Sequence, residues 1–224
     1  INWAKFHKEV IESPVPYDPK IVEGISTIYD EYLPFISPDN ELAFFTRKMP
    51  VSDKFKAWQE ERFRELFCYS EKQNDEKFIA GTQMPTPPFN LHSNEGGATI
   101  TIDNKHLYYT IVEAGNYDIY GSNFVNGSWS EPKNLGKKVN HPDRWDSQPS
   151  ISSDGKLLYF ASDRPGGYGS VDIWQTEMDS AGNWKEAVNL GPVINTDGDE
   201  KAPFIHWDSK TLYFSSGENE MGTG

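Results

Sequence analysis

Asp146-Ser-Gln-Pro-Ser-Ile-Ser-Ser-Asp-Gly-Lys-Leu-Leu-Tyr-Phe160 occurs in four versions along the chain, at residues 31–45, 95–109, 146–160 and 200–214. Each version has an acid first, then a short β segment, a turn that begins with Asp, and a strand rich in aromatic residues. The aligned isoleucines are Ile36, Ile100, Ile151 and Ile205. Their spacings are 64, 51 and 54 residues, and self-similarity at such a period is typical of radial or solenoid repeats.

The third version continues into the most complete repeat. Residues 149–152 and 156–161 have strand character and flank Asp154-Gly155, a dipeptide typical of hairpin turns. Gly and Pro mark a loop at 162–167, and further strands are predicted at 171–176 and 184–190. Four antiparallel strands in about fifty residues are typical of one propeller blade. We therefore expect an all-β protein, a β-propeller with four-stranded antiparallel blades, of which three are complete and one is partial, with a short N-terminal helix.

The repeat also sets the expected boundaries. Residues 1–19 would be the end of a preceding helical region and a linker, because Trp3, Phe6 and Val10 stand at helical spacing before Pro14. Residues 20–224 would be an incomplete propeller: a closing strand at 20–27, blade 1 at 31–90 with a helical insertion at 52–64, blade 2 at 95–140, blade 3 at 146–195, and the start of blade 4 at 200–224. Closed propellers typically have about four to eight blades. We therefore expect the chain to be a segment of a longer protein.

Composition excludes some partners. The 224 residues include 21 basic and 34 acidic side chains, which gives a formal charge of −13. Phosphate backbones and anionic lipid surfaces repel such a chain, so we expect no nucleic-acid partner. No apolar run approaches the roughly 18 residues of a membrane-spanning helix, and we expect no direct membrane insertion. Cys68 is the one cysteine, so an internal disulfide is excluded.

Several segments resemble a known family. Ser37-Pro-Asp-Asn40, Ser152-Ser-Asp-Gly155 with the following Leu158-Tyr-Phe-Ala-Ser-Asp-Arg164, and Asn189-Leu-Gly-Pro-Val-Ile-Asn-Thr196 resemble the PD40 repeat, the WD40-like repeat of TolB-type propellers. The connector 184–191, Trp-x-Glu-x-x-Asn-Leu-Gly, is similar to that of envelope proteins with a tetratricopeptide region, a PD40 propeller and an OmpA-like domain, among them a type IX secretion system component. The second and fourth versions depart from the turn pattern, with Thr-Ile-Asp-Asn at 101–104 and His-Trp-Asp-Ser at 206–209.

The resemblance implies a periplasmic protein, associated with the outer membrane, that binds other envelope proteins and catalyses no reaction. It would be a protein–protein interaction scaffold of the bacterial cell envelope, in a secretion complex or a peptidoglycan-anchored complex. Peptidoglycan would be reached only through a domain outside these residues. The alternative is a propeller that binds a peptide or glycan in its channel, or that gates a hydrolase domain outside this segment. Propellers host both kinds of function.

The acids that begin the repeats are the sharpest candidate site: Glu31, Glu95, Asp146 and Glu200. First strands line the channel of a propeller, so the four acids would form an acidic ring at one channel mouth. Such a ring would attract a cation or a basic peptide, because like charges in a confined mouth focus the electric field. In the other interpretation, each carboxylate accepts hydrogen bonds from backbone amides of the turn between repeats. We favour this structural interpretation, because an acid present in every repeat is more simply a requirement of the fold.

The remaining candidates are aromatic and basic residues in loops. Phe55 and Trp58 in the insertion, and Arg144 and Trp145 before a first strand, are candidate partner contacts, since Trp and Arg are enriched at the energetic centres of interfaces. The sequence has no motif for an activated nucleophile, a phosphate loop or a zinc site. The acidic run Asp197–Glu200 matches no calcium-loop spacing. We therefore expect no enzyme activity, no metal and no cofactor.

Overall fold

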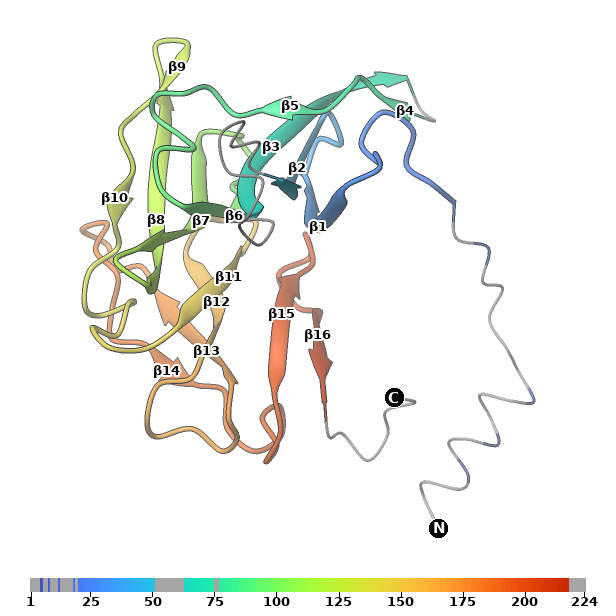
Figure 1. Ribbon diagram of the computed structural model, residues 1–224. Helices are drawn as coiled ribbons and strands as arrows, with labels where there is room; N and C mark the ends of the chain where they lie inside the picture. The colour runs from blue at the N-terminus through green and yellow to red at the C-terminus, as the bar shows by residue number, and fades with distance from the viewer. Residues whose placement is uncertain are drawn as a thin grey trace, which may run out of the picture.

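The computed structural model of the protein describes residues 20–50, 63–74 and 77–217, together with residues 5, 8, 12 and 18. The described residues confirm an all-β protein built of antiparallel sheets (Figure 1). Its strands are β1 (Asp30–Ile36), β2 (Leu42–Pro50), β3 (Phe63–Asn74), β4 (Lys77–Phe78), β5 (Thr82–Gln83), β6 (Asn94–Ile100), β7 (His106–Glu113), β8 (Asn116–Val125), β9 (Ser128–Trp129), β10 (Lys133–Asn134), β11 (Asp146–Ile151), β12 (Leu157–Ser162), β13 (Asp172–Glu177), β14 (Val188–Asn189), β15 (Glu200–Ile205) and β16 (Leu212–Ser216).

The strands repeat one pattern. An antiparallel hairpin begins each repeat: β1–β2, β6–β7, β11–β12 and β15–β16. In the first three repeats a third strand pairs with the second one, and a two-residue outer strand pairs with the third: β3 with β5, β8 with β10, and β13 with β14. The first strands β1, β6, β11 and β15 are the innermost ones (Figure 1). We number the repeats 1 to 4 in chain order.

The Asp-led turns form the hairpins through local hydrogen bonds. In repeat 3 the Ser152 hydroxyl donates to Asp154 at 2.6 Å, and the Asp154 carboxylate accepts from the Lys156 amide at 3.1 Å. The same contacts occur at Ser37 and Asp39 and, with a threonine, in repeat 2. The residue after each Asp has a positive φ, which Gly155 adopts at 71° without a steric penalty. This turn holds the register of each hairpin.

Every first strand contains a β-bulge. The register shifts between Tyr32 and Phe35 in β1 and at the equivalent place in β6, β11 and β15. The residue within each shift has a positive φ between 50° and 60°: Leu33, Gly97, Gln148 and Ala202. A bulge bends its strand and redirects the side chains that follow. The repeat therefore presents the same bent strand to the centre each time.

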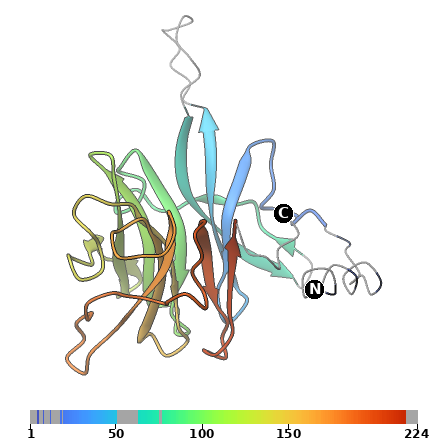
Figure 2. The same cartoon turned by 90° about the horizontal axis from the view of Figure 1, so that it is seen from below.

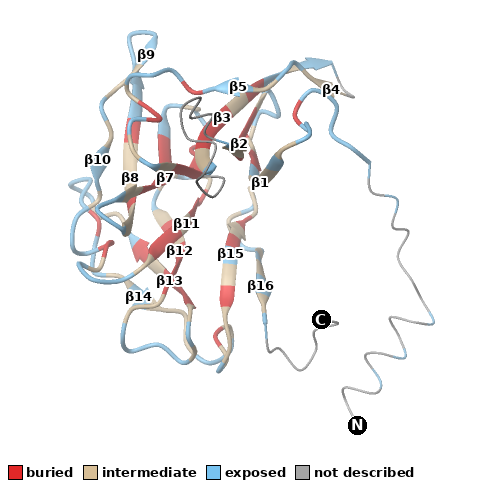
Figure 3. Cartoon of the chain, viewed as in Figure 1, coloured by how far each residue is buried: buried red, intermediate tan, exposed pale blue. Residues whose placement is uncertain are grey.

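Aromatic and aliphatic side chains pack between the sheets. Phe67 and Tyr109, both fully buried, stack at 5.1 Å between ring centroids and join β3 to β7. A second cluster contains Ile151, Leu158 and Phe160 of repeat 3 together with Tyr108 and Ile119 of repeat 2. Figure 3 shows buried residues concentrated along the middle of the strands. These clusters fix the repeats against one another.

Several expected elements differ from the structure or lie outside the described residues. The predicted fourth strand at 184–190 is reduced to β14 and an isolated bridge between Met178 and Trp184. Residues 20–27, expected as a closing strand, contain a turn at 23–25 that is bonded to residues 78–81 of repeat 1. Of the expected helices, residues 51–62 and most of 1–19 lie outside the described residues, and residues 63–64 belong to β3. Figure 2 shows that β2 and β3, the strands on either side of residues 51–62, project past the neighbouring strands.

Candidate functional site

The four first strands enclose a channel. Its cavity has a volume of about 210 Å³ and is lined by three or fewer neighbouring residues of each strand: Leu33, Pro34, Phe35, Gly97, Ala98, Gln148, Pro149, Ser150, Ala202, Pro203 and Phe204. Neighbouring first strands are joined by hydrogen bonds from backbone to side chain. The Ile151 amide donates to the Thr99 hydroxyl at 3.2 Å, and the Ile205 amide donates to Ser150 at 2.9 Å. The channel wall is thus largely apolar and held between repeats.

The four recurring acids are bonded to the turns that precede them. Glu95 accepts from the amides of Asn90 and His92 at 2.7 and 2.9 Å. Glu200 accepts from the amide and hydroxyl of Thr196, both at 2.7 Å. Glu31 accepts from the equivalent Thr27 amide at 3.0 Å, and Asp146 accepts from the His141 amide at 2.6 Å. These are the hydrogen bonds that the structural interpretation of the acids predicts.

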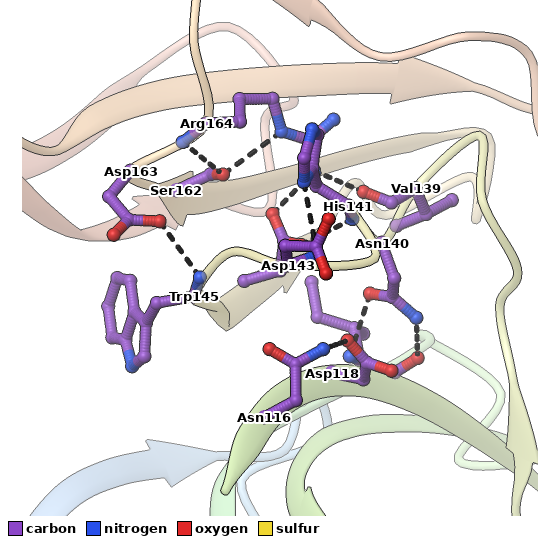
Figure 4. A network of polar contacts seen from close by, with 12 residues as sticks. Asn116, Asp118, Val139, Asn140, His141, Asp143, Trp145, Ser162, Asp163 and Arg164 are labelled. Atoms are coloured by element: carbon purple, nitrogen blue, oxygen red, sulfur yellow. Dashed lines mark hydrogen bonds and ion pairs between the residues drawn. The ribbon is translucent and has the colours of Figure 1, made fainter.

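Two of the acids also meet an arginine from the neighbouring second strand or its loop. Arg47 donates from Nε to Glu31 at 2.7 Å and from Nη2 to the Ile25 carbonyl at 2.9 Å. Arg164 bonds to Asp146 and to the Val139 carbonyl, and it also donates to the Ser162 hydroxyl. Figure 4 shows Arg164 lying across Ser162 toward Val139. Each arginine ties an acid to the segment that precedes its own repeat.

The surroundings of the acids change their pKa values in opposite directions. Burial raises the pKa of Asp146 above its ordinary value although Arg164 opposes that change, because the side chain is fully buried. Burial also acts on Glu31, but the hydrogen bonds from Thr27 and Arg47 outweigh it and lower the pKa of Glu31. Both carboxyl groups serve contacts inside the fold. Of the four acids, only Glu95 borders either cavity at the channel.

A second cavity lies where the channel opens beside the acids. This mouth pocket has a volume of about 160 Å³, and its lining includes the side chains of Tyr32, Glu65, Tyr117 and Trp145, all half-buried. The rings of Tyr117 and Trp145 are 6.3 Å apart between centroids. Burial and a hydrogen bond to Glu65 raise the pKa of the Tyr32 hydroxyl, which therefore stays protonated at neutral pH. Three aromatic residues and two glutamates, Glu65 and Glu95, thus line a small opening.

The predicted partner contacts are only partly described. Trp145 lines the mouth pocket, whereas Arg144 is exposed and is absent from its lining. Figure 4 shows the Trp145 indole pointing away from Arg164 and His141. Phe55 and Trp58 lie outside the described residues. The sequence-based reasoning missed Tyr32, Glu65 and Tyr117, although Tyr32 directly follows Glu31, which the repeat alignment singled out.

The reasoning also missed a buried asparagine in each connector. Asn140 accepts from the Ile119 amide at 2.8 Å and donates to the Ile119 carbonyl at 2.9 Å. Asn90 and Asn195 make the same pair of bonds to the third strands of their own repeats. The signal was an Asn five or six positions before the acid of the next repeat. We call these three residues the connector asparagines.

The described residues show no group suited to metal chemistry or to a reactive thiol. No cluster of three or more His, Cys, Asp or Glu side chains that could hold a metal ion occurs among them. Cys68 is fully buried, and burial raises the pKa of its thiol to about 11. Such a thiol is protonated and inert at neutral pH. Within the described part of the chain, no helix is long and apolar enough to cross a membrane.

Repeated antiparallel sheets around one channel define a β-propeller fold, and solved propeller structures are similar to this chain. The structure is similar to TolB from Acinetobacter baumannii, with a TM-score of 0.50 and 18% identity over 87% of this chain and 40% of that one. It is also similar to a TolB-like protein from Agrobacterium tumefaciens, with a TM-score of 0.56 and 17% identity over 91% of this chain and 60% of that one. The chain therefore spans less than two thirds of either protein. No protein-family model and no curated sequence matches it.

Proposed function

We propose that this chain is a non-catalytic protein-interaction scaffold of the bacterial cell envelope, and that its mouth pocket receives a lysine or arginine side chain of a partner. The observation that carries the proposal is the grouping of Tyr32, Tyr117 and Trp145 around the Glu65 carboxylate at the channel opening. Aromatic faces attract cations through their quadrupole, by about 0.5–2 kcal/mol. A nearby carboxylate adds a charged hydrogen-bond acceptor.

The similarity to TolB structures supports the envelope part of the proposal. We propose a periplasmic location with outer-membrane association, in a secretion complex or a complex anchored to peptidoglycan through another domain. Cell fractionation of the tagged full-length protein tests this location. Recovery in the cytoplasm would contradict it.

Binding at the mouth pocket is tested with the peptide Gly-Gly-Arg-Gly-Gly, its citrulline counterpart and the intrinsic tryptophan fluorescence. Glu65→Gln removes the carboxylate with little change in shape, and Trp145→Ala removes one aromatic wall. Glu71→Gln is the matched control, because Glu71 is exposed and lies outside the pocket. We expect the arginine peptide to bind the wild type and the control alike, and Glu65→Gln to weaken binding about tenfold.

Two results would contradict the mouth-pocket assignment: equal binding of the citrulline peptide, or equal weakening by both glutamine variants. The partner itself is sought by capture from an envelope fraction, comparing the wild type with Trp145→Ala. An envelope protein captured by the wild type and lost with the variant supports the scaffold function. Identical capture by both proteins would leave the pocket without a role in that interaction.

A further inference from the structure

The structure has two equivalent grooves on the outer side of the repeats. One lies between repeats 1 and 2 and has a volume of about 750 Å³; the other lies between repeats 2 and 3 and has a volume of about 930 Å³. Both are built from the start of a second strand, the end of a third strand, the connector, and the outer hairpin of the following repeat. Trp129 and Trp184 occupy the same place in that hairpin. Both volumes fall within the roughly 300–1,000 Å³ of typical ligand sites.

The two grooves differ in chemistry at their connectors. In the first groove the connector contributes Met84 and three prolines. In the second groove β10 and the connector contribute Lys133, Lys137 and Lys138, all exposed. We call the second one the lysine groove. Because the same elements build both grooves, the grooves differ in their side chains and not in their backbone elements.

The lysine groove has more positive than negative side chains, three lysines against one aspartate. None of its three lysines has an ion pair within the described residues. One carboxylate lines the groove, that of Asp179, and it accepts hydrogen bonds from the Ala181 and Asn183 amides of its own turn at 2.9 Å. A local excess of positive charge is unexpected in a chain whose net charge is −13. The excess favours a negatively charged occupant.

The floor of the groove is aromatic. Tyr108 and Trp184, exposed by 8% and 9%, pack edge to face with 5.8 Å between their centroids. Leu135 packs against the same cluster beside the lysines. An occupant that fits both features carries carboxylates for the lysines and an apolar side chain for the floor. A peptide of Asp and Glu residues around an apolar residue has this composition.

We infer that the lysine groove binds an acidic peptide segment of a partner protein, at a site separate from the mouth pocket. An anionic lipid surface is the less suitable occupant, because the whole chain would be repelled by it. Charge complementarity of this kind raises the association rate and selects the partner.

The test uses a fluorescein-labelled peptide, Asp-Glu-Asp-Leu-Phe-Asp-Glu-Asp, and its Asn/Gln counterpart in a fluorescence anisotropy titration. One variant carries Lys133→Gln, Lys137→Gln and Lys138→Gln. The matched control replaces three exposed lysines that follow the hairpin-turn aspartates, K105Q, K156Q and K210Q, and has the same net charge. We expect the acidic peptide alone to bind, about tenfold more weakly to the groove variant, and within about twofold of the wild type to the control.

Equal weakening by both triple variants would overturn the inference, because it would show that the peptide responds to the net charge of the chain and not to the lysine groove. Absence of binding to the wild type would overturn it too, as would binding of phosphatidylglycerol vesicles in place of the peptide. The single variant Lys137→Glu, with its melting temperature measured alongside, provides a second test that does not depend on the triple variant folding. Because the mouth pocket is probed with a basic peptide, failure at one site leaves the other result intact.

Discussion

Replacing Asn140 by Ala should destabilise the chain strongly, although it removes one small polar side chain. The Asn140 carboxamide is 4% exposed and makes three hydrogen bonds: from the Ile119 amide, to the Ile119 carbonyl and to Asn134 Oδ1. The Ile119 carbonyl keeps a second donor, the Leu135 amide at 3.1 Å, whereas the Ile119 amide has no other bond among those described. A buried amide left without a partner costs about 1–3 kcal/mol, and the two other bonds contribute about 0.5–1.5 kcal/mol each.

The expected loss of unfolding free energy is therefore about 2–6 kcal/mol. Urea unfolding followed by circular dichroism measures it, and hydrogen exchange of the Ile119 amide locates it. Asn183→Ala is the control, since Asn183 is exposed and its side chain only reaches Asp179 at 3.5 Å. A loss for Asn140→Ala below about 1 kcal/mol at an unchanged m-value would refute the reasoning.

Three further outcomes follow from individual contacts in the structure. Arg164→Met leaves the buried Asp146 carboxylate without its cation, and we expect denaturant unfolding at pH 7 to show a loss of about 3–5 kcal/mol in unfolding free energy. Burial raises the pKa of Asp146, so the protonation of this carboxyl group favours folding below pH 3.8, and that contribution is lost as the pH rises. The destabilisation by Arg164→Met should therefore be smaller in acid. Ser152→Ala removes the largest cause of the lowered pKa of Asp154, so an NMR titration should show that pKa moving back toward 3.8, and the stability difference from the wild type should decrease as the pH falls below that value. Gly96→Ala would place a methyl group 1.9 Å from a threonine hydroxyl oxygen of β2, and should lower stability by about 1–3 kcal/mol in a thermal melt, against no change if the neighbour can move aside.

The hairpins were predictable because their causes are local. Ser152, Asp154 and Gly155 form the turn with hydrogen bonds between neighbours in sequence, so the letters alone predict it. The short outer strands were not predictable, because an asparagine side chain makes some of the hydrogen bonds that a longer outer strand would make. Asn195 supplies an acceptor and a donor to Ile173 where a longer strand would offer backbone groups, which shortens β14 to two residues.

The candidate site was less accessible to sequence-based reasoning. The acids recur visibly, but the hydrogen bonds of Glu95 to the turn before it depend on how the connector folds back. The mouth pocket joins Tyr32 and Glu65 of repeat 1 to Tyr117 of repeat 2 and Trp145 of repeat 3. Residues at different positions in different repeats give no periodic signal. Only the three-dimensional arrangement brings them together.

The connector asparagines have a consequence for how the surface of this fold can diversify. Since a carboxamide reproduces the pairing of a peptide group, each connector is fixed to the third strand of its own repeat without a contribution from the outer hairpin. The rim of the molecule is therefore free to change its chemistry while the axis keeps its shape. One scaffold can carry a proline-lined groove beside a lysine-lined one, at Met84 and at Lys137, without any alteration of the channel between them.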